Sequence, residues 1–236
     1  MPTQLVIIHI IELIAAIAGS IYYLKTKDKI LKPFVWYLWF VVFVETVGMY
    51  GYIMQWNFDN ELFIKLKNSA FCENRWLYNT FAFVSLLFYW FFYNSIISDK
   101  KSKGLLDVLG ILYVVFTLGF FIVTDGFFVK QIPYDAFLET LFIFVAVILY
   151  YRQLLIGENV LYFYREPLFY VSTSLLLWHL IITPLVIFDG YFNLINKRFI
   201  GFRMNYLLFT NIILYSCYTF GFLYTLQFRK QFRMKK

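Results

Sequence analysis

The chain has 236 residues, of which 61% are hydrophobic and 24% are aromatic. These shares are far above those of a soluble domain, and too few polar residues remain to cover a soluble core of this size. The net charge of +7 would suit nucleic acid, but the basic residues flank long apolar runs. We therefore interpret the charge as an orientation signal, expect no nucleic-acid partner, and predict a polytopic membrane protein in contact with the lipid bilayer.

Seven segments are long enough to cross about 30 Å of hydrocarbon as helices. In chain order they are residues 4–24, 33–55, 76–98, 105–124, 136–155, 167–188 and 205–227. The first has no basic residues before it and no small-residue cleavage site, so we interpret it as a membrane span rather than a signal peptide. The pattern predicts an all-α fold with seven transmembrane helices in a single domain, residues 1–236.

Lys and Arg are distributed unevenly between the two sets of connections. One set holds fourteen of the 21 basic residues, namely Lys25, Lys27, Lys29, Lys32, Lys100, Lys101, Lys103, Arg152, Arg165, Arg229, Lys230, Arg233, Lys235 and Lys236. The other set holds Lys65, Lys67, Arg75, Lys130, Lys197, Arg198 and Arg203. Because cytoplasmic loops are enriched in basic residues, we expect the N-terminus outside and the C-terminus in the cytoplasm, in a bacterial inner membrane.

Two connections on the predicted outer side, residues 57–75 and 189–204, are long and half apolar. This composition is typical of short amphipathic helices that lie in the membrane interface. A lid over an outward-facing pocket is the alternative interpretation of the same two segments.

Spans one to three and spans five to seven share residues at equal spacings. The matched pairs are Glu12–Tyr23 with Glu139–Tyr150, Pro33–Glu45 with Pro167–His179, and Asn79–Tyr89 with Asn205–Tyr215. This pattern favours a 3+1+3 arrangement, in which two parallel halves, residues 1–99 and 135–229, are joined by a linker helix at 105–124. Chance alignment of runs rich in Phe, Leu and Tyr is the alternative.

Five ionisable side chains lie inside these apolar runs: Glu12, Glu45, Glu139, His179 and, one helical turn before Glu12, His9. A charge near the bilayer centre costs roughly 2.5–3.5 kcal/mol even on insertion scales, so such groups are expected to face the bundle interior and to serve a function. A helical rise of about 1.5 Å per residue places them in the outer half of the membrane, together with Asn211.

Ser172 and Thr183 share a helix face with His179. We therefore expect a polar pocket near the outer surface, with these ligand-binding or proton-binding candidates: Glu12, Glu45, Glu139, His179, His9, Asn211, Ser172 and Thr183. In this hypothesis Glu45 and His179 bind the ligand or proton, while Glu12 and Glu139 orient or neutralise them. Asp107, near the cytoplasmic start of the fourth span, is expected to be solvated and paired with Lys103.

Three functions fit such a pocket. A sensor would bind a small ligand, or titrate with external pH through an imidazole, and would need a separate partner because the tail after residue 227 is short. A transporter would use the two halves and the carboxylates for proton-coupled transport. A metal-dependent membrane enzyme would hold its ion on His9, Glu12, Glu45 and His179; no other cofactor is predicted. Polar contacts that only join helices are the structural alternative.

Three sets of residues carry a resemblance to other membrane proteins. They are Ile11-Glu12-Leu13 with Tyr22-Tyr23-Leu24-Lys25, Leu77-Tyr78-Asn79 with Leu87-Phe88-Tyr89, and Arg165-Glu166-Pro167-Leu168-Phe169-Tyr170. With these residues the chain resembles uncharacterised bacterial seven-transmembrane-helix proteins of the sensor-partner type. The resemblance implies a separate membrane or cytoplasmic signalling partner, such as a kinase, and therefore favours the sensor. A homo-oligomer stays an open alternative.

Overall fold

The computed structural model describes residues 3–54, 60–124, 126–129, 134–189 and 197–233, and all regular structure in these residues is helical. The long helices are α1 (Thr3–Thr26), α2 (Lys32–Gly48), α5 (Arg75–Ile96), α6 (Lys100–Val123), α8 (Asp135–Ile156), α9 (Pro167–Asp189) and α10 (Lys197–Arg233). The short ones are α3 (Tyr50–Ile53), α4 (Glu61–Lys67), α7 (Gly126–Val129) and the 3-10 helix η1 (Glu158–Arg165). The predicted all-α class is confirmed for these residues.

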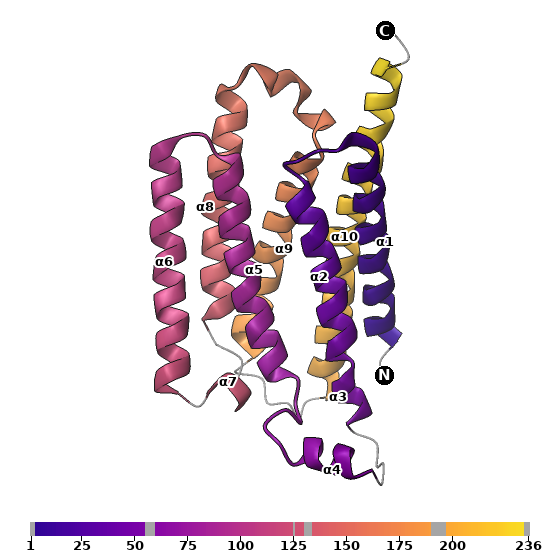
Figure 1. Ribbon diagram of the computed structural model, residues 1–236, viewed down its shortest axis with the longest axis vertical. Coiled ribbons are helices and arrows are strands. Elements are labelled where there is room, and N and C mark those ends of the chain that lie inside the picture. Colours follow the sequence, from indigo (N-terminus) through magenta and orange to yellow (C-terminus); the bar gives the residue numbers. More distant parts are fainter. Residues whose placement is uncertain (1–2, 55–59, 125, 130–133, 190–196, 234–236) are drawn as a thin grey trace.

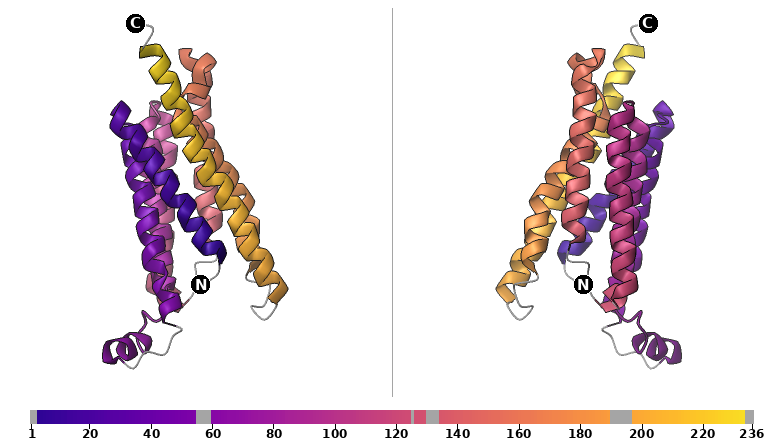
Figure 2. Two further views of the ribbon diagram at one scale, coloured as in Figure 1. Left: turned by 90° about the vertical axis from the view of Figure 1, so that its right-hand side faces the viewer. Right: turned by 90° about the vertical axis from the view of Figure 1, so that its left-hand side faces the viewer.

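Six of the long helices form a closed ring. Contacts run from α1 to α2, from α2 to α5, from α5 to α8, from α8 to α9, from α9 to α10 and from α10 back to α1. Helix α6 lies outside this ring, against α5 and α8 (Figure 1). The N-terminus and α4 lie at one end of the bundle and the C-terminus lies at the other (Figure 1). Toward the α4 end, α9 and α10 incline away from α2 and α5 (Figure 2).

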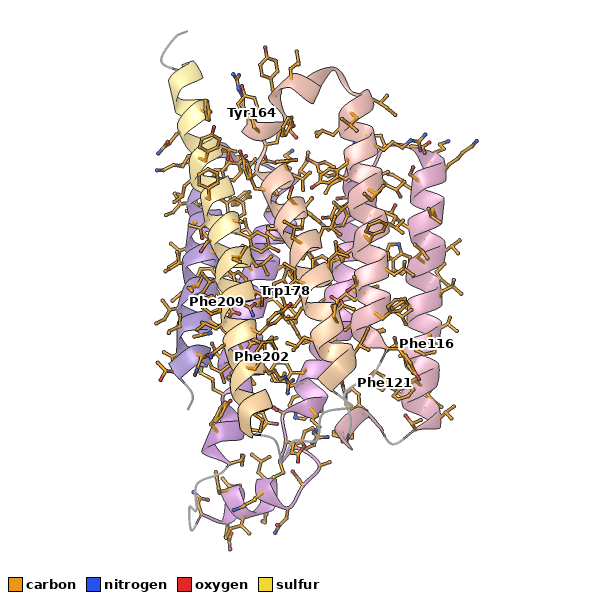
Figure 3. All side chains as sticks on the ribbon, turned by 180° about the vertical axis from the view of Figure 1, so that it is seen from behind. Phe116, Phe121, Tyr164, Trp178, Phe202 and Phe209 are labelled. Carbon is orange, nitrogen blue, oxygen red and sulfur yellow. The ribbon has the colours of Figure 1, made fainter. Side chains whose placement is uncertain are left out.

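The outer surface of the bundle is apolar. Large hydrophobic side chains such as Phe43, Ile122 and Phe209 are 62%, 84% and 64% exposed, and side chains project outward all along the long helices (Figure 3). Six of the described helices are long and apolar enough to cross a membrane, at Thr3–Thr26, Lys32–Tyr52, Lys100–Val123, Ala136–Ile156, Pro167–Ile187 and Ile200–Phe228. These features are those of a multi-pass membrane protein.

Helix α5 corresponds to the third predicted span but is not among these six candidates. It has 22 residues and stands within the same bundle as the others (Figure 1). Its composition is rich in tyrosine, tryptophan and asparagine, whose polar groups lower the hydropathy of a helix that is otherwise aromatic.

Aromatic rings fill the half of the bundle that lies toward the C-terminus. Phe34 is fully buried, with its ring centroid 5.2 Å from that of Tyr218 and 5.6 Å from that of Phe92. At Gly19, a β-carbon would lie 3.2 Å from the ring of Phe222, so the absence of a side chain permits α1 and α10 to approach closely. This half is therefore densely packed, and space for a site is found toward the α4 end.

Two helices begin earlier than the hydropathy pattern predicts. α6 begins at Lys100, rather than near residue 105, because the Asp99 carboxylate caps it and accepts the backbone N–H of Ser102 at 3.0 Å. The Ser102 hydroxyl also donates to Asp99, and this bond holds the pKa of the Asp99 carboxyl below its usual value. α10 begins at Lys197, rather than near residue 205.

The second predicted span and the connection after it also differ from expectation. α2 ends at Gly48, and the short α3 continues in its direction after Met49. The following connection contains α4, whose Leu62 is 75% exposed. A short helix in this connection was expected, and it lies on the α2 and α5 side of the bundle, away from the beginning of α10 (Figure 2). The other long connection, residues 189–204, lies partly outside the described residues.

Asp107 does not pair with Lys103 as predicted. Instead its carboxylate accepts hydrogen bonds from the indole N–H of Trp90 at 2.9 Å and from the Asn94 side chain at 2.5 Å. A β-carbon at Gly110 would lie 2.3 Å from the Trp90 ring. The prediction was wrong because α6 begins earlier than expected, which places Asp107 two turns inside the helix and against α5. These contacts attach α6 to the ring.

Candidate functional site

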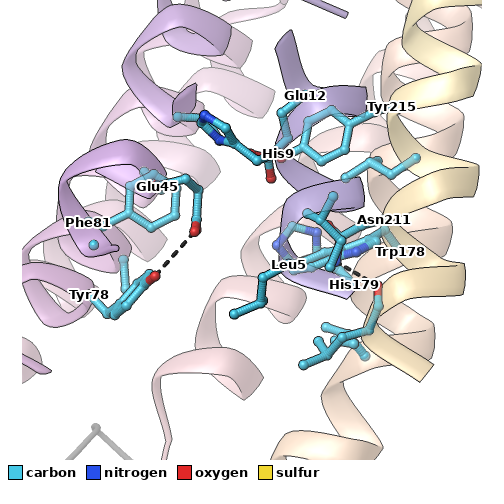
Figure 4. A pocket seen from close by; sticks show the side chains of 18 of the residues that line it. Leu5, His9, Glu12, Glu45, Tyr78, Phe81, Trp178, His179, Asn211 and Tyr215 are labelled. Carbon is cyan, nitrogen blue, oxygen red and sulfur yellow. Dashed lines mark hydrogen bonds and ion pairs between the residues drawn. The ribbon is translucent and has the colours of Figure 1, made fainter. Parts of the chain in front are cut away.

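A cavity of about 540 Å³ lies inside the ring of helices, in the half that carries α4. It extends from Leu5, Tyr52 and Asn74 near the helix ends to Tyr218 at mid-bundle. Six of the predicted site residues, from five helices, line it: His9, Glu12, Glu45, Glu139, His179 and Asn211. Figure 4 shows Glu45 with Tyr78 on one side and His179, Trp178 and Asn211 across from them. The volume is within the range of small-molecule sites, roughly 300–1,000 Å³.

His179 and Glu139 form one pair, which we name the α9 pair. His179 is 3% exposed, and its Nδ1 lies 3.0 Å from the carbonyl oxygen of Leu175. A carbonyl can only accept, so Nδ1 carries the hydrogen and Nε2 is a bare acceptor in the neutral ring. This Nε2 lies 3.6 Å from Oε1 of Glu139 and makes no hydrogen bond among the described residues. With Glu139 ionised, two acceptors therefore face each other.

His9 and Glu12 form a second pair, the α1 pair, with the same property. The Thr46 hydroxyl donates its hydrogen to the carbonyl of Val42 at 2.7 Å, so it must accept from Nε2 of His9 at 3.3 Å. In the neutral His9 ring Nδ1 is then the bare acceptor. It lies 3.6 Å from Oε2 of Glu12, and neither atom makes a hydrogen bond to a described residue. Glu12 itself is 3% exposed.

Glu45 differs from the other two carboxyl groups because no imidazole is paired with it among the described residues. The phenol of Tyr78 donates to Oε2 of Glu45 at 3.2 Å. Gly48, one turn further along α2, lies directly beneath that phenol, since a β-carbon there would be 2.8 Å from the Tyr78 oxygen. The glycine thus permits the contact between α2 and α5 that brings the hydroxyl to Glu45.

Tyrosines form the deep wall of the cavity. The buried Tyr37 hydroxyl donates to Ser85 at 3.0 Å and lies 3.1 Å from the Tyr89 hydroxyl. Tyr215 and Tyr218 complete this wall. In the sequence, Tyr89 and Tyr215 mark the repeat and Tyr78 belongs to one of the runs that carry the resemblance, but none of the wall tyrosines was predicted as a site residue. The chain has 20 tyrosines, and their spacing alone does not separate those that face the cavity from those that face lipid.

Two predicted site residues do not line the cavity. Ser172 is fully buried deeper in the bundle, where it accepts a hydrogen bond from the Tyr93 hydroxyl at 3.0 Å. Thr183 donates to the backbone carbonyl of His179 at 2.6 Å and shares a hydrogen bond with Thr140. Both residues join helices, so the geometry does not support a direct role in binding. They share a helix face with His179, but the inclination of α9 places only part of that face on the cavity.

The predicted metal set is not brought together. Among the described residues, no group of three or more His, Cys, Asp or Glu side chains is placed to hold a metal ion. The His9, Glu12, Glu45 and His179 set therefore does not fit a metal centre, because its members lie in separate pairs or, for Glu45, beside a tyrosine. A metal-dependent mechanism has no support from this arrangement.

Comparisons of the chain with protein-family models, with curated proteins and with solved structures gave no match. The function is therefore argued from the cavity, its carboxyl and imidazole groups, and the ends of the bundle at which charges gather.

Proposed function

We propose that the chain is a seven-helix protein of a bacterial inner membrane. It binds a small ligand from the extracytoplasmic side and signals this binding to a separate partner protein. The observation that carries the proposal is the convergence of six chemically active side chains, from five helices, on one cavity. Ionisable groups inside a membrane bundle nearly always face its interior and mark a functional pathway or site. A role limited to joining helices would not require a cavity of about 540 Å³.

The proposed orientation follows from the basic residues. The connections between α1 and α2, between α5 and α6 and between α8 and α9 lie at the same end as the C-terminus (Figure 1). This end carries most of the Lys and Arg residues, so the positive-inside rule favours a cytoplasmic location for it. The cavity would then face the outside, and α5 would be the seventh span. A C-terminal fluorescent-protein fusion should be fluorescent and a C-terminal alkaline phosphatase fusion inactive.

The arrangement of the ring supports the proposed 3+1+3 repeat. In such a repeat, α1, α2 and α5 correspond to α8, α9 and α10, in that order. The contact between α1 and α10 then corresponds to the contact between α8 and α5. Both contacts exist, and α6 lies outside the ring as a linker would. Matched positions also meet at the cavity, in the pairs Glu12 with Glu139, Glu45 with His179, Ser85 with Asn211 and Tyr89 with Tyr215. Duplicated membrane folds often place a binding site between their halves.

The packing favours a sensor over a carrier. The half of the bundle beyond the cavity is filled by buried rings, including those of Phe34, Phe92 and Phe222. A ligand in the cavity would therefore act on packed helices, and a change in their packing is the kind of signal that a partner can detect. A proton-coupled transporter is the second candidate, favoured by the two halves that flank the cavity, because such halves can rock against each other.

Binding is tested with the purified protein in lipid nanodiscs. Trp178 lines the cavity, so its fluorescence should report occupancy. A panel of amines, carboxylic acids, sugars and neutral aromatics is screened by fluorescence and by melting temperature, with Glu45→Gln and His179→Gln compared with wild type. We expect at least one compound class to bind the wild type and to lose affinity in both variants. If no class distinguishes the wild type from the variants, the proposal fails.

The sensor and the carrier are then separated with the compound that binds. Uptake into proteoliposomes would support the carrier. Binding without uptake, together with ligand-dependent crosslinking to a co-purifying partner, would support the sensor.

A further inference from the structure

We propose that the ligand of this cavity is a primary or secondary amine with an apolar body, bound as its ammonium ion between the imidazole and carboxyl groups of the α1 and α9 pairs. This inference rests on the proposed binding function and names the chemical class of the ligand. It derives from the direction of the hydrogen bonds, from the charge of the cavity and from the aromatic rings of its wall.

The first observation is that, in both pairs, two hydrogen-bond acceptors face each other with no donor from the described residues between them. In the α9 pair, the bare Nε2 of His179 faces Oε1 of Glu139 at 3.6 Å. In the α1 pair, the bare Nδ1 of His9 faces Oε2 of Glu12 at 3.6 Å. Buried acceptors of this kind are normally satisfied, and a donor located between the two atoms of a pair would satisfy both. An ammonium ion carries such donors together with a positive charge.

The second observation is the charge of the cavity. Three carboxyl groups line it, whereas Arg203 is the one Lys or Arg side chain among its described lining residues. An anion would therefore face three acidic side chains and a single guanidinium group, which is unfavourable for its binding. A cation in this cavity gains from the carboxyl groups of both pairs, and each of the imidazole nitrogens can accept a hydrogen bond from it.

The third observation is the aromatic wall. Tyr37, Tyr89, Trp178 and Tyr215 all line the cavity, so aromatic rings border the space that an apolar body and a cation would occupy. The indole N–H of Trp178 makes no hydrogen bond among the described residues, which leaves one donor for an acceptor elsewhere on the ligand. Protonation of both imidazoles would also supply the missing hydrogens, and this explanation competes with an amine ligand.

The test uses four probes that share one phenyl ring and one linker: phenethylamine, phenethyl alcohol, hydrocinnamate and phenethyltrimethylammonium. They present a cation with N–H donors, a neutral hydroxyl, an anion and a cation without N–H donors. Binding to the full chain in nanodiscs is measured near neutral pH by calorimetry. We expect the amine to bind about tenfold more tightly than the alcohol and the quaternary cation, as for loss of a charge-assisted hydrogen bond, and the anion not to bind.

Three variants connect binding to the two pairs. Glu12→Gln and Glu139→Gln preserve the size of the side chain and supply an N–H donor, so each should weaken amine binding by about tenfold and leave the alcohol within about threefold of wild type. Glu61→Gln, on the exposed α4, is the matched control and should bind like wild type. Using carboxyl variants at both pairs keeps the test valid if one of them fails to fold.

The outcomes separate this inference from the proposed function. Equal binding of the amine and the quaternary cation would overturn the assignment of N–H donors. Tighter binding of the alcohol or of hydrocinnamate, sensitive to the same variants, would overturn the amine class while preserving the binding site. No binding by any probe would overturn the amine class, and if the wider panel also fails, the proposed binding function fails with it.

Discussion

Substitution of Gly48 by alanine tests the packing that positions Glu45. The new β-carbon would lie 2.8 Å from the Tyr78 hydroxyl oxygen, closer than such atoms approach in real structures, so the phenol must move. Its hydrogen bond to Glu45, already 3.2 Å long, would be lost. We expect this loss to cost about 1.5 kcal/mol, between the values for neutral and charged acceptors. Better helix propensity would offset about 0.5 kcal/mol, because Gly48 is at the end of α2.

The same reasoning predicts that Gly48→Ala, which destabilises the wild type, stabilises a protein that already carries Tyr78→Phe. Without the hydroxyl there is neither a clash nor a bond to lose, so Gly48→Ala should stabilise that protein by about 0.5 kcal/mol. The coupling between the two substitutions should therefore be about 1.5 kcal/mol. It is measured as a double-mutant cycle of reversible unfolding in mixed micelles. An equal effect of Gly48→Ala in both backgrounds would refute the contact between the phenol and the glycine.

Three further predictions concern structure outside the cavity. Gly110→Ala would place its β-carbon 2.3 Å from the Trp90 ring and should destabilise the protein by about 1–3 kcal/mol in the same unfolding assay, an effect that Trp90→Ala should abolish. Ser172→Ala should lower stability by about 1 kcal/mol through loss of the Tyr93 hydrogen bond, and should leave ligand affinity unchanged in titrations. Asp99→Ala should lower the melting temperature at neutral pH; because the folded-state pKa of Asp99 is depressed below 3.8, the difference from wild type should persist above that value and disappear as the pH falls below it.

The positions of the long helices and of several cavity residues could be predicted from the apolar runs and from the ionisable residues inside them. The apolar lengths predicted seven spans, and six of the described helices are long and apolar enough to cross a membrane in the predicted order. The helical rise predicted a similar depth for Glu12, Glu45, His179 and Asn211, and all four line one cavity. Glu139 also lines the cavity, where its carboxyl group lies 3.6 Å from the His179 ring.

Other features depend on contacts that no single helix encodes. The partner of Glu45 is Tyr78 on another helix, and the close packing of this tyrosine against Gly48 is a contact between helices that the sequence pattern does not reveal. The bare nitrogen of His9 is determined by the hydroxyl of Thr46, which donates within its own helix. The early start of α6 depends on the Asp99 cap, a local signal that a hydropathy average does not detect. The rotation and inclination of each helix determine which of the predicted residues line the cavity.

Thiol accessibility in intact cells tests most directly whether an acid-lined cavity opens to the outside. In a background with Cys72 and Cys217 replaced by serine, Asn211→Cys places a thiol at the cavity, and Phe209→Cys places one on the exposed apolar surface of α10. Membrane-impermeant methanethiosulfonates of opposite charge are then applied. We predict that the thiol at position 211 reacts from outside, faster with the cationic reagent, and that the thiol at position 209 does not react. Protection of position 211 from the outside, or faster reaction with the anionic reagent, would contradict the account.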